Sequence, residues 1–421
     1  MKNRSYSGLL ATITLSGFGD TFGLLAMEWM IYELTGSKLA MGTLALCSGI
    51  PELTLRLLGS PLADRFPRER FMAALAAVRL IAIALPLVAG LTGHLQLWHL
   101  FAAAVLSGSC AALFMPTAMA VVPNVADGRK LVRAFAVIDG ARNAAALLGP
   151  ALAGAVTAAK GALPALGVNA ACYALAIATL MYLPKSRDQT GRTAAFSIRA
   201  YVREIAEGFS FYRHFPAMLA IMGMVSVSNM NSMAVWTMMV PYVREVLHGD
   251  AAAVGTMTTF SALGTLAGLA VISLIREIER RRAVMLCSLA AIGLFNIIPG
   301  VIPNYYVALA AFFAAGAAGP FFGSLSSSLH GKLVPAHLQG RVNSIRFLIG
   351  GSLAPVGAFA GGLLAELYGV PVLFVSAGLL TLVCSCIALL IPGLKALNGS
   401  LAELEGKLHF RPAADSNALA E

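Results

Sequence analysis

The chain has 421 residues, of which 58% are hydrophobic and only 12% are charged, and its formal net charge is +10. Soluble domains carry about 25% charged residues. A soluble globular protein is therefore excluded, because this chain lacks the polar residues to cover such a surface. Intrinsic disorder is excluded as well, because disordered chains are poor in hydrophobic residues. The composition predicts a polytopic membrane protein.

Apolar stretches follow one another along most of the chain, and each is close to the roughly 20 residues that a helix needs to cross a bilayer. We expect an all-α membrane protein with twelve transmembrane helices, at residues 8–34, 40–63, 71–92, 97–122, 134–158, 164–183, 217–241, 252–275, 283–301, 306–330, 342–365 and 371–392.

The basic residues are distributed unevenly between the two sides of these spans. One set of alternate loops holds just three of them: Lys38, Lys160 and Arg244. Four lie within the spans, and the remaining 23 of the 30 lie in the termini, the central loop and the opposite loops. Because cytoplasmic loops are enriched in Lys and Arg, we expect both termini in the cytoplasm. The positive charge then faces anionic lipid headgroups and not nucleic acid.

The sequence repeats itself with a period of roughly 210 residues. Val122-Pro123 recurs as Val334-Pro335, and Gly149-Pro150 recurs as Ala354-Pro355. We therefore expect two six-helix halves, at residues 1–184 and 217–395, with a cytoplasmic tail at 396–421. Repeats of this kind place the ligand between the halves near the bilayer midplane.

The polar stretch 185–216 joins the halves. Its apolar residues recur at helical spacing, which predicts a basic amphipathic helix on the inner membrane surface; a plain solvated linker is the alternative. The stripe is Ile198, Tyr201, Ile205, Phe209 and Tyr212.

The loop after the second span reads Ser60-Pro-Leu-Ala-Asp64-Arg65-Phe-Pro-Arg68-Glu-Arg70. It resembles the signature loop of the major facilitator superfamily, G-x-L-A-D-R-x-G-R-[RK], with departures at Ser60, Pro67 and Glu69. The resemblance implies that Asp64, together with Arg65 and Arg68, docks at the start of the eleventh span and closes an inner gate, with Arg341 or Arg346 as a neighbour. A carboxylate is stabilised at a helix N-terminus by free N–H groups and the helix dipole. The alternative is an ordinary basic loop.

Further motifs are similar to those of the drug:proton antiporter-3 branch of that superfamily, which includes macrolide and siderophore exporters. They are Gly19-Asp20, Tyr32-Glu-Leu-Thr-Gly-Ser37, Val125-Ala-Asp-Gly-Arg-Lys-Leu-Val-Arg-Ala134 and Gly149-Pro150-Ala-Leu-Ala-Gly154. The resemblance implies a proton-coupled exporter in a bacterial cytoplasmic (inner) membrane. Gly149, Pro150 and Gly154 match its antiporter motif, in which small residues allow close helix contact; generic packing is the alternative.

Apart from Glu33 at the end of the first span, eight charged residues lie inside the predicted spans: Asp20, Glu28, Glu52, Arg56, Arg79, Asp139, Arg142 and Arg346. Each costs roughly 2.5–3.5 kcal/mol at the bilayer centre, so these residues must pair or line a water-filled cavity. Glu52 and Arg56 are spaced i,i+4, and Asp139 and Arg142 are spaced i,i+3, so each pair can form on one helix face.

A buried carboxylate can take up a proton near neutral pH unless a cation stabilises its charge. The rise of a helix places Asp20 and Glu52 near the midplane. We expect Asp20 to couple transport to protons, with Arg79 nearby, and Glu52 to be the second candidate. Glu28 either couples protons or meets a cationic substrate. A structural ion pair is the alternative for the acids that have a basic neighbour.

The second half offers neutral polar groups. Asn229, Ser232 and Trp236 share one helix face in the seventh span, and Ser324, Ser326, Ser327 and Ser328 cluster in the tenth. Hydrogen-bonding groups beside an aromatic ring suit an amphiphilic ligand, so we expect the first three to bind substrate. Helix–helix hydrogen bonds are the alternative.

No motif of enzyme chemistry, metal ligation or nucleotide binding is recognisable, so we expect a carrier with no cofactor and no metal. The expected function is export of small amphiphilic compounds by proton antiport and alternating access. Its partners would be the substrate, protons and membrane lipids, and the chain would be monomeric. An exporter of an anionic metabolite such as a siderophore, and a lipid flippase, are the alternatives.

Overall fold

The computed structural model describes residues 2–58, 66–126, 130–181, 209–213, 215–275, 278–335 and 338–399, and within these ranges the regular structure is entirely helical. An apolar span in a bilayer folds as a helix, because lipid offers no hydrogen-bond partners to backbone N–H and C=O groups and a helix pairs these groups internally. The predicted all-α class is confirmed.

Six long helices form the first half: α1 (Lys2–Thr35), α2 (Lys38–Leu58), α4 (Arg68–Leu91), α5 (Leu97–Val125), α6 (Leu131–Lys160) and α7 (Ala162–Leu180). The second half contains α9 (Pro216–Thr237), α10 (Met239–Pro241), a π-helical turn η2 (Tyr242–Val246), α11 (Ala251–Leu274), α12 (Arg281–Val301), α13 (Tyr305–Leu333), α14 (Gln339–Ser352), α15 (Ala354–Tyr368), α16 (Val370–Leu389) and a 3₁₀ turn η3 (Pro392–Leu397). Each predicted span coincides with one of these helices or with a consecutive pair.

Ten spans in the described part of the chain are long and apolar enough to cross a membrane, with α14 and α15 together forming one of them. Helices α2 and α6 are not among the ten, and both contain charged pairs that lower their hydropathy. The count of twelve membrane spans therefore stays a prediction.

The internal repeat is visible in the turns as well as in the sequence. Gly161 ends α6 and Gly369 ends α15, and both have a φ of +88°. Only glycine adopts this backbone conformation without strain. The two glycines lie 208 residues apart, in agreement with the repeat that the sequence predicted.

The predicted linker falls mostly outside the described residues, which resume at 209–213 with a helical segment. Tyr212 was expected on a stripe that faces the membrane surface. It is instead fully buried in the core of the second half, and its hydroxyl lies 3.0 Å from His330 Nε2.

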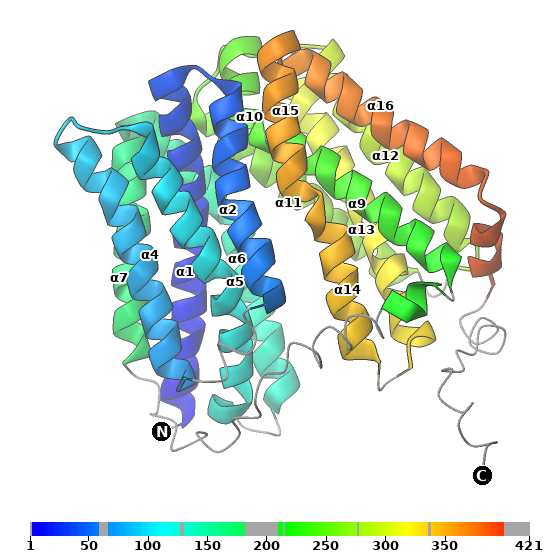
Figure 1. Ribbon diagram of the computed structural model, residues 1–421, viewed down its shortest axis with the longest axis horizontal. Coiled ribbons are helices and arrows are strands. Elements are labelled where there is room, and N and C mark those ends of the chain that lie inside the picture. Colours follow the sequence, from blue (N-terminus) through cyan, green and yellow to red (C-terminus); the bar gives the residue numbers. More distant parts are fainter. Residues whose placement is uncertain are drawn as a thin grey trace.

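The two bundles converge at one end and diverge toward the other, where α1 and α14 begin (Figure 1). The hydrophobic core has the same asymmetry. At the converging end one cluster runs through both halves, from Trp29 and Met30 of α1 to Tyr242 and Phe374. At the other end each half has its own cluster. Apolar burial therefore joins the halves at one end only.

Two helix crossings bring the backbones of the halves into close contact, α2 with α15 and α6 with α11. A Cβ atom at Gly42 would lie 2.7 Å from the Ala358 carbonyl oxygen, and one at Gly154 would lie 2.5 Å from the Ala251 carbonyl oxygen. A Cβ at Gly255 would lie 2.2 Å from the carbonyl oxygen of Pro150. The structure thus places Pro150 and Gly154 of the antiporter-like motif at the contact between the halves.

Gly149, the remaining residue of that motif, packs within the first half, where a Cβ would lie 2.2 Å from Thr21 Oγ1 of α1. It therefore fixes the distance between α6 and α1.

A larger residue at the crossing should separate the halves. We expect Gly154→Leu to lower the free energy of unfolding by about 1–3 kcal/mol, because inserted side chains force packed elements apart. Gly140→Leu is the matched control, since it lies on the same helix with open space around its Cβ position. Thermal unfolding of the purified variants measures the difference, and equal melting temperatures for the two would contradict this description of the crossing.

Candidate functional site

A cavity of about 590 Å³ lies between the halves and is lined by both of them. Its volume is in the range of about 300–1,000 Å³ that is typical of small-molecule sites. The first half contributes four charged residues, and the second half contributes Met233, Trp236, Thr237, Met239, Val254, Gly255 and Thr258. The four charged residues are Asp20, Glu28, Glu52 and Arg79.

Asp20 is held in a triad formed by three helices. Its Oδ1 accepts hydrogen bonds from the Arg79 guanidinium of α4 and from the Tyr173 hydroxyl of α7. Arg79 is 5% exposed, Tyr173 is 1% exposed, and the guanidinium lies 4.8 Å from the centroid of the tyrosine ring. The negative charge of Asp20 is thus matched by a buried cation.

Glu28 lies on α1 two turns beyond Asp20, toward the converging end, and it also lines the cavity. Its carboxylate makes no hydrogen bond or ion pair with any residue that the structure describes. It is therefore the one cavity carboxylate without a charged partner among these residues. Its charge can be neutralised by a proton or by a bound cation.

The remaining embedded acids form local pairs at the predicted spacings. Glu52 Oε1 accepts a hydrogen bond from Arg56 at 2.5 Å, and Asp139 lies 3.6 Å from Arg142. The paired side chains are 36% to 62% exposed. Exposed pairs on one helix contribute only about 0.3–0.5 kcal/mol. These two pairs reduce the cost of embedding their charges, and Glu52 also borders the cavity.

The predicted substrate-binding face of α9 is divided between two roles. Trp236 lines the central cavity, and both Ser232 and Trp236 line a second cavity within the C-terminal half. Asn229 does not line either of them. Its amide donates to the Gly350 carbonyl of α14 at 2.8 Å, which favours the alternative of a helix–helix hydrogen bond, and a binding role for Asn229 stays a prediction.

The predicted gate is only partly described. Asp64 and Arg65 lie outside the described residues. Arg68 donates to the carbonyl oxygen of Ala120 at 2.9 Å, within the first half. Arg341 and Arg346 lie in α14, and the Arg346 guanidinium donates to Ser327 Oγ at 2.7 Å. A contact between Asp64 and α14 therefore stays a prediction.

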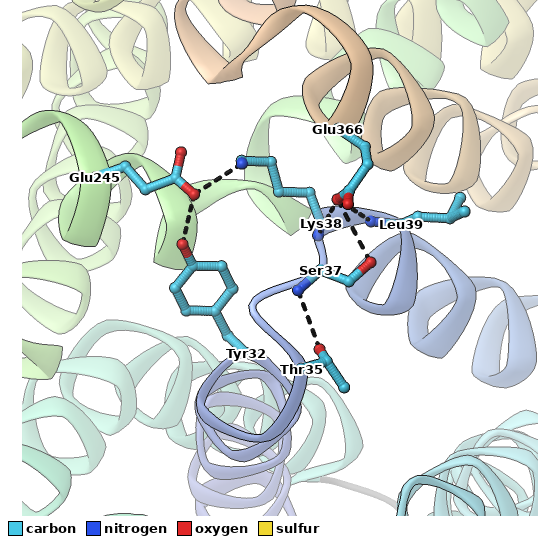
Figure 2. Close-up of polar contacts among 7 residues, drawn as sticks. All are labelled: Tyr32, Thr35, Ser37, Lys38, Leu39, Glu245 and Glu366. Carbon is cyan, nitrogen blue, oxygen red and sulfur yellow. Dashed lines mark hydrogen bonds and ion pairs between the residues drawn. The ribbon is translucent and has the colours of Figure 1, made fainter.

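A polar clamp joins the halves at the converging end (Figure 2). Glu245 of η2 accepts a hydrogen bond from Tyr32 at 2.6 Å and forms an ion pair with Lys38 at 2.7 Å. Glu366 of α15 accepts the backbone N–H groups of Lys38 at 2.7 Å and Leu39 at 3.3 Å. The N-terminus of α2 is thus capped by a carboxylate from the other half, which satisfies free N–H groups and the helix dipole.

Arg244 adds a second inter-half contact beside the clamp. Its guanidinium lies 3.2 Å from Glu33 and 4.6 Å from the centroid of the Trp29 ring. Sequence reasoning did not select the three acids Glu33, Glu245 and Glu366 as functional residues. The sequence signal that could have pointed to these acids is the presence of Lys38 and Arg244, because that set of alternate loops holds only three basic residues.

Comparison with known proteins decides the family. The model of the transmembrane secretion effector family, MFS_3, matches residues 1–416. The chain belongs to this family of the major facilitator superfamily. It is therefore a multi-pass membrane transporter and not an enzyme, as the sequence predicted.

Relatives are similar over nearly the whole chain. The multidrug efflux pump Tap of Mycolicibacterium fortuitum is 23% identical over 403 residues, covering 93% of this chain and 96% of Tap. The MFS-type transporter YfiS of Bacillus subtilis is 24% identical over 414 residues, covering 94% and 93%.

Solved structures show the same fold. A bacterial homologue of the human lysosomal transporter Spinster, in an inward-facing and unoccupied conformation, superposes with a TM-score of 0.70 at 14% identity over 98% of this chain and 99% of that one. A bacterial homologue of ferroportin in an inward-facing state gives 0.69 at 17% identity over 91% and 98%. The predicted major facilitator fold is confirmed.

Breaking the clamp should open the converging end. We expect Lys38→Ala combined with Glu366→Ala to increase the population open at this end about five- to thirtyfold, since the loss of 1–2 kcal/mol shifts an equilibrium by that factor. Spin labels at Leu34→Cys and Leu367→Cys, exposed positions on opposite halves, in a background without the native cysteines, report the distance by electron paramagnetic resonance.

Lys160→Ala is the control for the clamp variants, because Lys160 is an exposed basic residue at the end of α6 and takes no part in the clamp. An unchanged distance distribution in the clamp variants would show that these contacts do not hold the halves together.

Proposed function

We propose that this transporter exports cationic amphiphilic small molecules across the bacterial inner membrane in exchange for protons, by alternating access. The asymmetry of Lys and Arg supports a cytoplasmic position for both termini. Because α1 begins at the end where the halves diverge (Figure 1), the central cavity would face the cytoplasm and the clamp would face the outside. Substrate would then enter from the cytoplasm.

The observation that carries this proposal is the unpartnered carboxylate of Glu28 in a cavity shared by both halves. The surrounding wall is largely apolar, with Leu24, Met27, Ile83 and Val254 among its residues. A carboxylate in such a wall requires a counter-charge or a proton. One group cannot hold a proton and a cationic amine at the same time. Competition between them supplies the exchange that antiport needs.

Asp20 was the first candidate for coupling from the sequence, and its contacts favour a different role. Protonation of Asp20 would leave the buried Arg79 without its counter-charge, which is unfavourable because the guanidinium is withdrawn from water. We therefore propose that the Asp20–Arg79–Tyr173 triad fixes α1 against α4 and α7, and that Glu28 carries the proton. Glu52 remains the second candidate for coupling, at the edge of the same cavity.

Alternating access would use the contacts between the halves. The two halves would rotate about the glycine crossings, where their backbones are in contact. The clamp would hold the converging end closed. Opening to the outside would require the contacts of Glu245 and Glu366 to break while the diverging ends approach each other. The Tap relatives are named multidrug efflux pumps, and this supports a broad range of amphiphilic substrates.

An anionic substrate is less well supported. Arg79 is the one arginine that lines the central cavity, and its charge is matched by Asp20. Arg56 and Arg142 are likewise paired with acids on their own helices. A siderophore-like carboxylate would have to displace one of these acids. A lipid flippase has no specific observation in its favour.

Replacing Glu28 should abolish coupled transport. In proteoliposomes with an acidic lumen, the wild-type protein should accumulate ethidium against its gradient as protons leave. We expect Glu28→Gln to reduce this gradient-driven accumulation at least about tenfold, because its amide neither releases a proton nor attracts a cation; tenfold corresponds to about 1.4 kcal/mol. Fluorescence of ethidium bound to DNA inside the vesicles measures uptake.

Asp139→Asn is the matched control, since it removes an embedded acid from the same half that is 62% exposed and does not line the cavity. It should retain coupled uptake. Full coupled uptake by Glu28→Gln would contradict the proposed role of Glu28.

A further inference from the structure

A second cavity, of about 680 Å³, lies within the C-terminal half among α9, α11, α12 and α13. It is distinct from the central cavity but shares one residue with it, because Trp236 lines both. A molecule in the central cavity could therefore extend past Trp236 into this C-terminal cavity.

Asn296 of α12 lines the C-terminal cavity and is 6% exposed. Its amide makes no hydrogen bond with any residue in the described ranges. Nearly all buried side-chain amides are hydrogen-bonded, because an unpaired one is costly. By contrast, the buried amide of Asn231 on α9 donates to Thr381 at 2.9 Å. The free amide of Asn296 thus has bonding capacity to offer to a molecule in the cavity.

Three hydroxyl groups from the other helices line the same cavity: Ser232 of α9, Ser261 of α11 and Ser324 of α13. Within the part of the chain that the structure describes, none of these hydroxyls has a hydrogen-bond partner. Most Ser and Thr hydroxyls in apolar helices bond a carbonyl of the preceding turn, as Thr256 and Thr258 do here. Four unpartnered polar groups on four helices therefore converge on one cavity.

The chemistry of the wall defines the ligand. None of the described residues that line this cavity is itself ionisable, and the Arg346 guanidinium, which donates to Ser327 of the wall, does not line it. Hydroxyl and amide groups both donate and accept hydrogen bonds, as do the hydroxyls of a sugar or polyol. The rings of Trp236 and Phe312, with centroids 5.6 Å apart and planes tilted by 35°, supply an apolar aromatic wall for the C–H face of such a ring.

We propose that the C-terminal cavity binds a neutral hydroxylated group, such as a glycosyl ring, through Asn296, Ser232, Ser261 and Ser324. Joined to the proposed function, this makes the preferred substrate an amphiphilic amine with a glycosyl or similar substituent. Its amine binds near Glu28, and its hydroxylated part lies beyond Trp236. Binding of a neutral glycoside rests on the C-terminal cavity alone, whereas the two-part substrate rests also on the role of Glu28.

The probe for the C-terminal cavity is 4-nitrophenyl β-D-glucoside, whose nitrophenyl group quenches tryptophan fluorescence. The protein is studied in lipid nanodiscs, because glycoside detergents would compete for the cavity. Trp98→Phe removes an exposed tryptophan, so that the signal comes from Trp236, which lines the cavity, and from the buried Trp29, which lines neither cavity. 4-Nitroanisole, which has the same ring without hydroxyl groups, is the control ligand.

We expect the glucoside to bind at least tenfold more tightly than nitroanisole, and Asn296→Leu to weaken glucoside binding about tenfold. The melting temperature of Asn296→Leu should be equal to or higher than that of the wild type, because an unpartnered buried amide is removed. Ser324→Ala provides the same test if Asn296→Leu does not fold. Ser273→Ala, an exposed position of α11 outside the cavity, should leave glucoside binding unchanged.

Ethidium binding separates the two proposals. Asn296→Leu should leave ethidium affinity unchanged, and Glu28→Gln should weaken ethidium binding without changing glucoside affinity. Absence of glucoside binding, or equal glucoside affinity in the wild type, Asn296→Leu and Ser324→Ala, would overturn the C-terminal site and leave the role of Glu28 untouched.

Discussion

The backbones of the two halves touch directly where α2 crosses α15 and where α6 crosses α11. Glycine at these crossings lets carbonyl groups of one half lie where a side chain would otherwise be. The shared hydrophobic core and the polar clamp lie at the converging end, whereas each half has a core of its own at the other end. In the proposed alternating access, each half would move as a packed unit about the crossings. The cavity between the halves lies beyond the end at which they share an apolar core.

The charges inside the spans fall into two groups with different consequences. Those with partners, such as Asp20 with Arg79, add rigidity to the first half, and their neutral pairs reduce the cost of embedding charge in the bilayer. Glu28 has no such partner among the described residues and lies in the shared cavity. A transporter that exchanges charge needs one site where the counter-charge comes from the ligand, and Glu28 meets that requirement.

Features that depend on local sequence were predictable. Apolar runs predicted the helices, and the i,i+4 and i,i+3 spacings predicted the pairs Glu52–Arg56 and Asp139–Arg142. Contacts between distant segments were predictable only where two embedded charges had similar depths, as for Asp20 and Arg79. Tyr173 lies 153 residues from Asp20, and no periodicity links them. Glu366 caps α2 from the other half, which requires the packed structure. Asn229 shared a helix face with Trp236, yet a neighbouring carbonyl takes up its amide. Residues 59–65, with Asp64 and Arg65 of the signature loop, lie outside the described ranges.

The most direct measurement of the central claim is proton release during substrate binding to the purified protein. Ethidium is titrated into the protein by calorimetry at a series of pH values, each in two buffers of different ionisation enthalpy, and the difference between the two binding heats gives the number of protons released. If a cation and a proton compete for Glu28, binding should release up to about one proton per ethidium in the pH range where Glu28 titrates, and Glu28→Gln should release none. Ethidium binding without proton release at any pH, or equal release from the wild type and Glu28→Gln, would contradict the exchange.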